Sequence, residues 1–336
     1  MKKGLIIGLL LCAMAVLFSC AGKPAPVAET PPPAPAPAAP PPAPAPTPPA
    51  PPPPPPPAPA APPPAPAPAV PENNGVFAYK MRNLEVYALV ESERDGNTAI
   101  IPGAGEAVLK RYIPAEGFKH STDAFLIKAS GRNILVDSGT GAGGVILDKL
   151  KGQGVAPDQV DAVLLTHLHG DHIGSLQKDG KPVFTKAKIY LNAKERDYFT
   201  KTAVNQAAVA ALNAYGSNVV AFDALPLGPV SREIIPGIRP IAAYGHTPGH
   251  TAYIVESGNS WLIIAGDFLH VALVQFPNPD ISATYDMDQQ AAAASRRELM
   301  DFAARNKIPI AGMHIVYPCI GMVEADGNGY RFIPVK

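Results

Sequence analysis

The sequence predicts a mixed α/β body with at least two β-sheets, preceded by a proline-rich tract. Between residues 72 and 336, apolar runs of strand length outnumber helical patterns, and helical patterns separate several of these runs. Such alternation is typical of mixed α/β domains. The tract at residues 24–71 holds 28 of the 42 prolines, so the remaining body has an ordinary proline content. We therefore expect one globular region at 72–336.

The first 20 residues are typical of an export signal. Lys2 and Lys3 precede an apolar run, residues 4–18, that is too short for a comfortable membrane span. The run ends at Ser19-Cys20 and resembles a bacterial lipoprotein signal, in which cleavage precedes a cysteine that becomes lipidated. We expect removal of residues 1–19 and a lipid on Cys20 that anchors the protein in the bacterial cell envelope, on the periplasmic or outer-membrane side. An ordinary cleaved secretory signal or an uncleaved anchor is the alternative.

Residues 20–71 are predicted to be a disordered tether. Proline lacks a backbone donor and fixes φ, which prevents helix and sheet. The tract should sample polyproline II at about 3.1 Å per residue, so residues 24–71 can reach on the order of 150 Å. We interpret it as a spacer; a ligand for aromatic-grooved modules is the alternative.

Charge and cysteine content exclude several classes of protein. The chain has 28 basic and 28 acidic side chains, and this balance disfavours a nucleic-acid binder. Its three cysteines are Cys12, Cys20 and Cys319. Because the first lies in the predicted signal and the second is the predicted lipid site, no disulfide framework or thiolate metal cage is expected.

The elements of the body follow from their apolar patterns. Strands are expected at residues 84–90, 124–128, 133–136, 160–165, 188–191, 238–243, 252–255, 261–264 and 308–311. The turn Ser130-Gly131-Arg132 makes 124–136 a hairpin candidate, and Gly327-Asn328-Gly329 turns another at 323–334. The nearly continuous apolar run at 160–165 indicates a strand buried on both faces. Helices are expected at 146–151, 193–214 and 288–305.

Seven of the eight histidines fall in four short segments, each after an apolar strand. The segments are residues 167–172 (HLHGDH), 245–250 (GHTPGH), 266–270 (GDFLH) and 312–314 (GMH). Loops that converge at strand ends are where sites are built on rigid scaffolds. His120 stands outside these segments, and we expect it to be an exposed loop residue.

The spacing within these segments predicts a site for two metal ions. His167 and His169 are two residues apart, so in an extended segment they point the same way and can share one ion with His246. Asp171 and His172 follow a glycine and can turn towards a second ion with His314. Asp267 has two oxygens and can bridge both ions. Open positions remain for water, as a catalytic site requires.

These motifs, HLHGDH, GHTPGH, Gly266-Asp267 and the late His314, resemble the metallo-β-lactamase fold superfamily. The stretches VQFPNP and GNGYRFIPV are similar to the methyl parathion hydrolase branch, which is related to acyl-homoserine lactonases. The resemblance implies an α+β fold, an αββα sandwich of two mixed sheets with helices outside. It also implies the ligand set given above, with Asp137 supporting the ligand loop from behind. We expect His250 to support the ligands or cap a helix.

Departures from the family patterns narrow the substrate. Zinc β-lactamases usually have cysteine where Asp267 stands, and flavo-diiron members have glutamate in the place of His169, so both activities are disfavoured. Homoserine-lactone lactonases have tyrosine where this chain has His270, which either touches the substrate or packs in the pocket wall. Tyr198 and Phe199 are candidate pocket walls, with ordinary core packing as the alternative.

The predicted function is hydrolysis of lactones or activated aryl esters, with phosphotriesters as a side activity. Hydroxide formed between two divalent ions attacks the substrate, and Asp171 can move the proton. Zinc is the first expectation for the metal, and manganese, iron or cobalt also suit these ligands. The partners are a small ester or lactone, the membrane through the lipid, and a second copy as in the dimers of this branch. The alternatives are a single-iron sulfur dioxygenase, a glyoxalase-II-like thioesterase and a non-enzymatic envelope protein.

Overall fold

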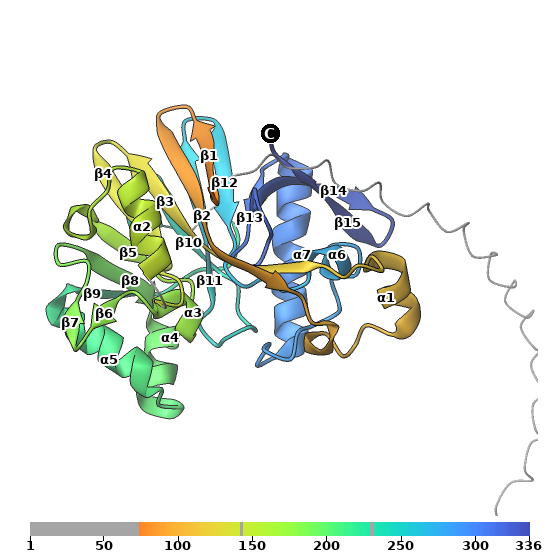
Figure 1. Ribbon diagram of the computed structural model, residues 1–336, viewed down its shortest axis with the longest axis horizontal. Coiled ribbons are helices and arrows are strands. Elements are labelled where there is room, and N and C mark those ends of the chain that lie inside the picture. Colours follow the sequence, from red (N-terminus) through yellow and green to blue (C-terminus); the bar gives the residue numbers. More distant parts are fainter. Residues whose placement is uncertain (1–73, 142–143, 229–231) are drawn as a thin grey trace, which may run out of the picture. The chain divides into compact units, whose positions relative to one another are not determined.

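The computed structural model describes residues 74–141, 144–228 and 232–336 (Figure 1). The predicted signal, Cys20 and the tether lie outside these described residues. Within the described ranges, no helix has both the length and the apolar character needed to cross a membrane. Cys319, within the same ranges, is a free and buried thiol.

The first sheet has seven strands in the order β1-β2-β3-β4-β5-β8-β9. Their bounds are β1 Val76–Met81, β2 Leu84–Asp95, β3 Lys119–Ala129, β4 Arg132–Val136, β5 Ala162–Leu164, β8 Lys188–Asn192 and β9 Val219–Phe222. β1 to β4 pair as antiparallel neighbours, whereas β4, β5, β8 and β9 are parallel. The parallel pairs need crossovers, which include helices α2 (Val145–Gly152), α3 (Gly170–Ile173), α4 (Ala193–Asp197) and α5 (Gln206–Tyr215).

The second sheet has six strands in the order β10-β11-β12-β13-β14-β15. Their bounds are β10 Ile238–Ala242, β11 Thr251–Ser257, β12 Ser260–Ile264, β13 Ile310–Ala311, β14 Ile320–Asp326 and β15 Gly329–Pro334. The parallel pair of β12 and β13 is connected through α6 (Ala272–Gln275) and α7 (Gln289–Asn306). A small ribbon of β6 (Gln177–Lys178) and β7 (Lys181–Pro182) stands apart.

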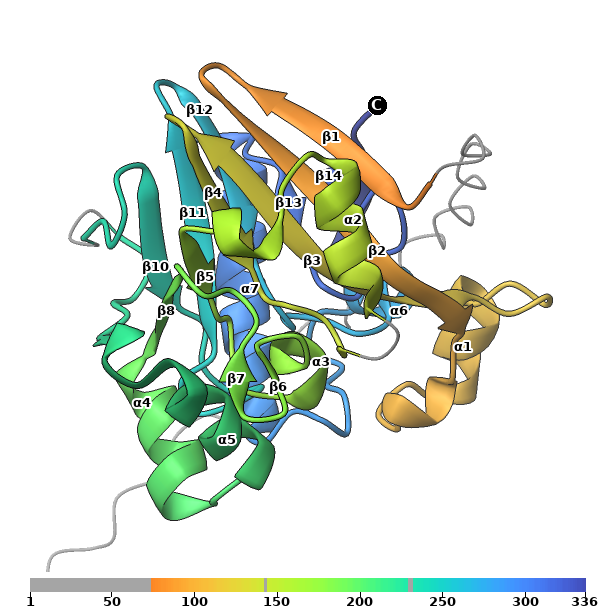
Figure 2. The same cartoon turned by 60° about the vertical axis from the view of Figure 1, so that its left-hand side comes forward.

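Three buried clusters define the layers of the sandwich. Alternate residues of β3 point to opposite faces: Leu126 joins a cluster with α2 and α5, whereas Phe125 and Ile127 join one that includes Leu262 and Ile264 of the second sheet. The outer face of the second sheet packs on α7. In Figures 1 and 2, α2 and α7 accordingly lie on opposite sides of the sheets. The predicted αββα sandwich is confirmed.

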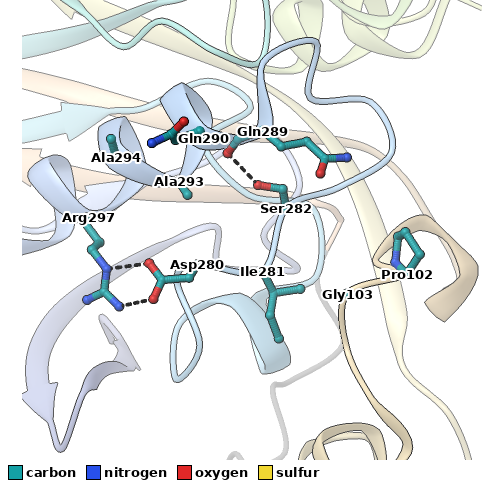
Figure 3. A pocket seen from close by; sticks show the side chains of 10 residues that line it. All are labelled: Pro102, Gly103, Asp280, Ile281, Ser282, Gln289, Gln290, Ala293, Ala294 and Arg297. Carbon is teal, nitrogen blue, oxygen red and sulfur yellow. Dashed lines mark hydrogen bonds and ion pairs between the residues drawn. The ribbon is translucent and has the colours of Figure 1, made fainter.

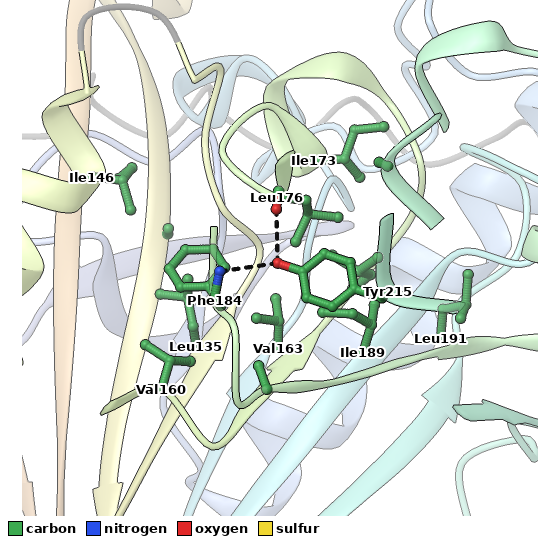
Figure 4. Close-up of a cluster of buried hydrophobic side chains, with 14 of the residues drawn as sticks. Leu135, Ile146, Val160, Val163, Ile173, Leu176, Phe184, Ile189, Leu191 and Tyr215 are labelled. Carbon is green, nitrogen blue, oxygen red and sulfur yellow. Dashed lines mark hydrogen bonds between the residues drawn. The ribbon is translucent and has the colours of Figure 1, made fainter. Parts of the chain in front are cut away.

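The apolar cluster between the first sheet and its helices α2 and α5 (the outer core) also contains a polar contact, made by the hydroxyl of Tyr215 at the end of α5 (Figure 4). It donates a hydrogen bond to the carbonyl of Leu176 at 2.7 Å and accepts one from the amide of Phe184 at 3.2 Å. Val163 and Ile189, on neighbouring parallel strands, pack in the same cluster. This contact fixes the chain that follows α3, directly after the histidine-rich segment.

Three predicted elements differ clearly from the structure. The strand expected at 84–90 continues to Asp95 and the strand expected at 124–128 begins at Lys119, because β2 and β3 stay paired past a register shift between Val90 and Ser92. The helix expected at 193–214 is broken into α4, a π-helical turn at Tyr198–Thr202, and α5, whose first turn is capped by the Asn205 side chain. Apolar periodicity cannot reveal this break, because the start of α5 is set by the polar side chain of Asn205 and not by an apolar pattern.

Several described elements had no sequence prediction, among them β1, β9 and α1 and the short elements α3, α6, β6 and β7. β1 and β9 are short strands at the two edges of the first sheet, where half-buried residues weaken the apolar pattern. Helix α1, Glu106–Tyr112, lies in the connection between β2 and β3 and has no fully buried residue of its own. Ile101, from the same connection, packs instead against Val271 and Val274 near α6.

Candidate metal centre

The four histidine segments all lie at strand ends. The segment 167–172 follows β5 and runs into the short helix α3, with Leu168 completely buried between its two flanking histidines. His246 lies between β10 and β11, Asp267 follows β12, and His314 follows β13. The fold therefore brings one contiguous segment of the first sheet to three separate loops of the second.

Three histidines form the first cluster. His167 Nε2 lies 3.0 Å from His169 Nδ1, and His246 Nε2 lies 3.2 Å from the former and 3.0 Å from the latter. The Oδ2 atom of Asp267 lies 3.4 Å from His246 Nε2 and 3.7 Å from His167 Nε2. These four side chains form a group that can hold a metal ion.

The second cluster shares the same aspartate. Asp267 Oδ2 lies 3.0 Å from His314 Nε2, and its Oδ1 lies 3.3 Å from His172 Nε2. Asp171 Oδ2 lies 3.5 Å from His172 Nε2 and 3.7 Å from His314 Nε2. The structure thus brings together all seven residues in the two groups that the spacing predicted, with Asp267 between them.

In four histidines, one ring nitrogen points away from the clusters (the outer nitrogen) and the other points into them. The hydrogen-bond partner of the outer nitrogen determines which of the two carries a proton. His246 Nδ1 faces Asp286, His172 Nδ1 faces Asp137, and His314 Nδ1 faces the carbonyl of Ser121. Because these partners only accept, each Nδ1 carries a proton, and each Nε2 presents a lone pair whenever its ring is neutral, as it must be to bind a metal ion. His167 Nδ1 likewise donates to the Thr166 hydroxyl, which gives its own proton to Asp137.

The converging lone pairs fit a cation. His172 Nε2 and Asp267 Oδ1 are buried and have no hydrogen-bond partner among the described residues. Two imidazole lone pairs at 3.2 Å, as in His167 and His246, repel unless a positive charge lies between them. Nitrogen and carboxylate donors suit zinc and related divalent ions. The residues present therefore fit a pair of metal ions.

The two clusters differ in their electrostatics. Burial, with the neighbouring His246, lowers the pKa of His169 to about 4. Burial also acts to lower the pKa of His314, but Asp267 and Asp171 outweigh it and raise that pKa to about 9. For Asp267 burial acts to raise the pKa, yet His172 and His314 hold it well below its usual range. The second cluster thus attracts positive charge more strongly than the first.

Two predicted supporting residues lie behind the clusters. Asp137, fully buried, accepts hydrogen bonds from the Thr166 amide and hydroxyl at 2.8 and 2.6 Å, and from His172. His250 donates from Nδ1 to the carbonyl of Ala243 and accepts at Nε2 from the amide of Asp267 at 2.9 Å. Both histidine nitrogens are thereby occupied, so His250 orients Asp267 from behind.

The predicted pocket residues lie on two sides of the site. The buried ring of Phe199 packs edge-on against His169, with centroids 5.9 Å apart, and Tyr198 packs beside it at the edge of the outer core. The buried His270 Nε2 lies 3.4 Å from Asp267 Oδ2, and its ring stacks on His314 at 4.8 Å. His270 therefore faces the shared aspartate directly.

The prediction for His120 is wrong. It lies in β3, is partly buried, and stacks on His314 with ring centroids 4.5 Å apart. Burial, with the neighbouring His314, lowers the pKa of its imidazole to about 4. No sequence pattern indicates this contact, because His314 lies 194 positions later in the chain and meets His120 only in the folded protein.

Sequence reasoning missed four residues around the site. Asp286 holds His246, Arg296 of α7 holds Asp286, Glu195 of α4 contacts two histidine loops, and the exposed Tyr285 ring lies 5.3 Å from that of His270. None belongs to a recognisable motif, and a lone charge within a helical pattern usually faces solvent. Burial identifies the three charged residues and the contact with His270 identifies Tyr285, and both come only from the fold.

A hollow on the described part of the chain lies away from the histidines (Figure 3). It measures about 590 Å³ and is lined by residues of the β2–β3 connection, the loop after α6 and α7, among them Pro102, Asp280 and Arg297. None of the described histidines lines it. The chemistry is therefore located by the side-chain clusters and not by that hollow.

Comparisons with known proteins agree with this geometry. Residues 118–306 match the family model of the metallo-beta-lactamase superfamily. The chain is similar to the solved structure of the hydrolase AbOPH of the beta lactamase superfamily, with a TM-score of 0.70 and 28% identity over 79% of this chain and 99% of that one. The chain is also similar to AidC, a dizinc quorum-quenching lactonase solved with a homoserine product. The TM-score is 0.69 and the identity is 25%, over 78% of this chain and 98% of AidC.

A curated relative points the same way. The N-acyl homoserine lactonase of Bacillus cereus is 26% identical over 153 residues, which is 42% of this chain and 55% of that protein. The chain spans less than two thirds of the length of the curated relatives it matches. These relatives therefore inform the central part of the fold more than the whole protein.

Proposed function

The chain belongs to the metallo-β-lactamase superfamily, and from that membership we propose that it is a hydrolase that opens lactones and activated aryl esters with two divalent metal ions. One observation carries the proposal: the Nε2 atoms of His167, His246, His172 and His314 converge around the two oxygens of Asp267. The similarity to a dizinc lactonase at 25% identity supports the substrate class.

Seven side chains would hold the ions. His167, His169 and His246 would bind one ion, Asp171, His172 and His314 the other, and Asp267 both. When bound, two divalent ions polarise a carbonyl oxygen and lower the pKa of water from about 15.7 towards 7. Zinc is our first choice of metal, because the donors are nitrogen and carboxylate oxygen.

Asp171 is the residue best suited to move a proton. Its side chain is 35% exposed, whereas that of Asp267 is 2% exposed. Burial acts to raise the pKa of Asp171, but His172 outweighs it, so the carboxyl is ionised at neutral pH and can accept a proton. A base that faces both the second cluster and solvent can pass the proton out of the site.

Aromatic side chains border the site on two sides. Phe199 lies against His169, and the exposed Tyr285 lies against His270. Burying the apolar part of a substrate against such rings favours acyl or aryl groups. His270, between Tyr285 and Asp267, would meet the substrate oxygen or the leaving group.

We also propose that the enzyme is anchored by a lipid in the cell envelope. The sequence at residues 1–20, with its two lysines, apolar run and Ser19-Cys20, supports a lipid-anchored envelope protein whose tether holds the hydrolase away from the membrane. The branch that includes methyl parathion hydrolase is our preferred placement within the superfamily, and phosphotriesters would then be a side activity. Metabolic labelling with a fatty acid, compared with a Cys20→Ala chain, tests the anchor.

Metal counting combined with a substrate panel tests the activity. We expect two ions per full chain, and hydrolysis of an aryl ester and a lactone that excess EDTA abolishes and Zn²⁺ restores. A phosphotriester, a thioester and a cephalosporin complete the panel. Undiminished hydrolysis by a metal-free chain in EDTA would overturn the proposal, and a single iron with oxygen consumption would favour the dioxygenase alternative.

A further inference from the structure

Glu195 is a buried acid whose described hydrogen bonds all go to the two loops that carry His167, His169 and His246. It lies in α4, a helix of five residues, and the residue is only 1% exposed. Its carboxylate accepts three hydrogen bonds: Oε1 from the amide of Leu168 at 2.9 Å, and Oε2 from the Thr247 hydroxyl at 2.8 Å and the Gly249 amide at 2.9 Å. The acid thus joins two loops that are about 80 residues apart in the chain.

Two of these donors directly flank histidines of the first cluster, and the third, Gly249, lies three residues after His246 in the same loop. Leu168 lies between His167 and His169, and Thr247 directly follows His246. The second cluster is supported differently, with His172 on Asp137 and His314 on the Ser121 carbonyl. No hydrogen bond described for Glu195 reaches Asp171, His172 or His314.

The loop around His246 is closely fitted to α4. A Cβ added to Gly249 would lie 2.3 Å from the Glu195 backbone nitrogen and 2.6 Å from its Cβ, so only glycine allows this approach. The carboxylate therefore holds the loop at a fixed distance from the 167–169 segment. Metal-site geometry tolerates displacements of only about 0.5 Å before binding suffers.

We propose that Glu195 is a positioning residue that sets the geometry of the ion site formed by His167, His169 and His246, and of that site alone. This inference rests on the proposed metal ligands. A carboxylate suits the task because it has only acceptors, and all three groups that face it are donors. Glutamine has the same shape, but its amide would turn an N–H towards an N–H and leave one buried donor without a partner.

The test compares ion binding by the full chain and by Glu195→Gln. Both are loaded with Zn²⁺ or Co²⁺ and titrated with a competing chelator, and bound ions are counted per chain. We expect the Kd of one ion to rise by about 10- to 100-fold, the usual range for groups behind metal ligands, while the other ion is unchanged. The Co²⁺ absorption that the variant loses should be the part that His169→Ala also loses.

Two further variants keep the test decisive if Glu195→Gln does not fold. Thr247→Val removes one donor and should weaken the same ion by less. Asp301→Asn changes a carboxylate that accepts a hydrogen bond from the Tyr330 hydroxyl, away from the ligand loops, and should keep both ions. Equal loss of both ions, or wild-type affinity at both sites, in Glu195→Gln or Thr247→Val overturns the inference. A wild-type chain that binds no ion would instead overturn the proposed function.

Discussion

The segment 167–172 and the three separate residues His246, Asp267 and His314 meet at one centre, but groups of different charge hold them in place. The segment is supported by acceptors: Asp137 binds the amide of Thr166, and Glu195 binds that of Leu168. Backbone N–H groups exposed by a non-helical turn need such acceptors when they are buried.

The separate loops are instead joined by a donor. Arg296, fully buried in α7, donates to the carbonyls of Phe268 and Pro279 at 2.6 Å each, and to Asp286 at 3.1 Å. It thereby connects the residue after Asp267 with the carboxylate that holds His246. A guanidinium has five N–H groups in a fixed plane, so one side chain can donate to three acceptors on the two segments that flank α6. The contiguous ligands are thus held by acceptors for their amides, whereas the Asp267 loop and the carboxylate behind His246 share one multivalent donor.

Removing a first-cluster ring should have the largest effect. His169→Ala deletes one of three nitrogens that lie within 3.2 Å of one another, so we expect loss of one ion and of all hydrolysis. Ion counting and aryl-ester turnover measure this. His120→Ala is the control, because His120 stacks on His314 but is not a proposed ligand, and it should keep both ions. Retained turnover in His169→Ala would contradict the assignment.

Replacing Arg296, which joins the separate loops, should have the next largest effect. Arg296→Met leaves the Asp286 carboxylate buried without its charged partner, which should lower the free energy of unfolding by about 3–5 kcal/mol. Arg297→Met, one residue along α7, breaks the exposed pair with Asp280 and an exposed hydrogen bond to the Asn328 carbonyl, and it should cost less than about 1 kcal/mol. Urea unfolding measures both. Equal losses would mean that Arg296 has no special role in joining the loops.

Weakening an acceptor of the contiguous segment should have a smaller effect. Asp137→Asn keeps a residue that tolerates the observed φ of 59°, but its amide N–H faces either His172 or Thr166, both of which donate. We expect metal affinity to fall by about 10- to 100-fold with the fold retained. Chelator titration and circular dichroism separate the two. Unchanged affinity would show that Asp137 does not orient His172.

The smallest expected effect concerns Asp123, a buried residue of β3 that lies two positions after Ser121, whose carbonyl holds His314. Burial raises its pKa well above the usual value, although a hydrogen bond from the Ser121 hydroxyl opposes the rise. The native state then binds more protons than the unfolded chain, so this carboxyl lowers stability as pH rises above about 4. Asp123→Asn should flatten that dependence in the metal-free chain. Unfolding curves at pH 5 and pH 8 measure it, and an unaltered slope would contradict the prediction.

Several elements were predictable because their neighbours in sequence define them. The apolar run at 160–165 gives β5, and the periodic segment at 288–305 gives α7 within a residue at each end. By contrast β9 and the break after Asp197 depend on an edge position and on a cap. A periodic apolar pattern arises only where one face of a helix or strand is buried. An element without such a face therefore cannot be predicted from periodicity.

The sequence by itself determined the chemistry of the site, because histidine and aspartate at strand ends have few other uses in combination, and because the hexapeptide carries four of its seven proposed ligands. Only the tertiary structure decided that His120 stacks on His314, that Glu195 and Arg296 are buried, and that the outer nitrogens of His167, His172, His246 and His314 each have an acceptor. The physical reason is that a charge reads the same in sequence whether it faces water or three buried partners, and the partners come from loops that only folding brings together.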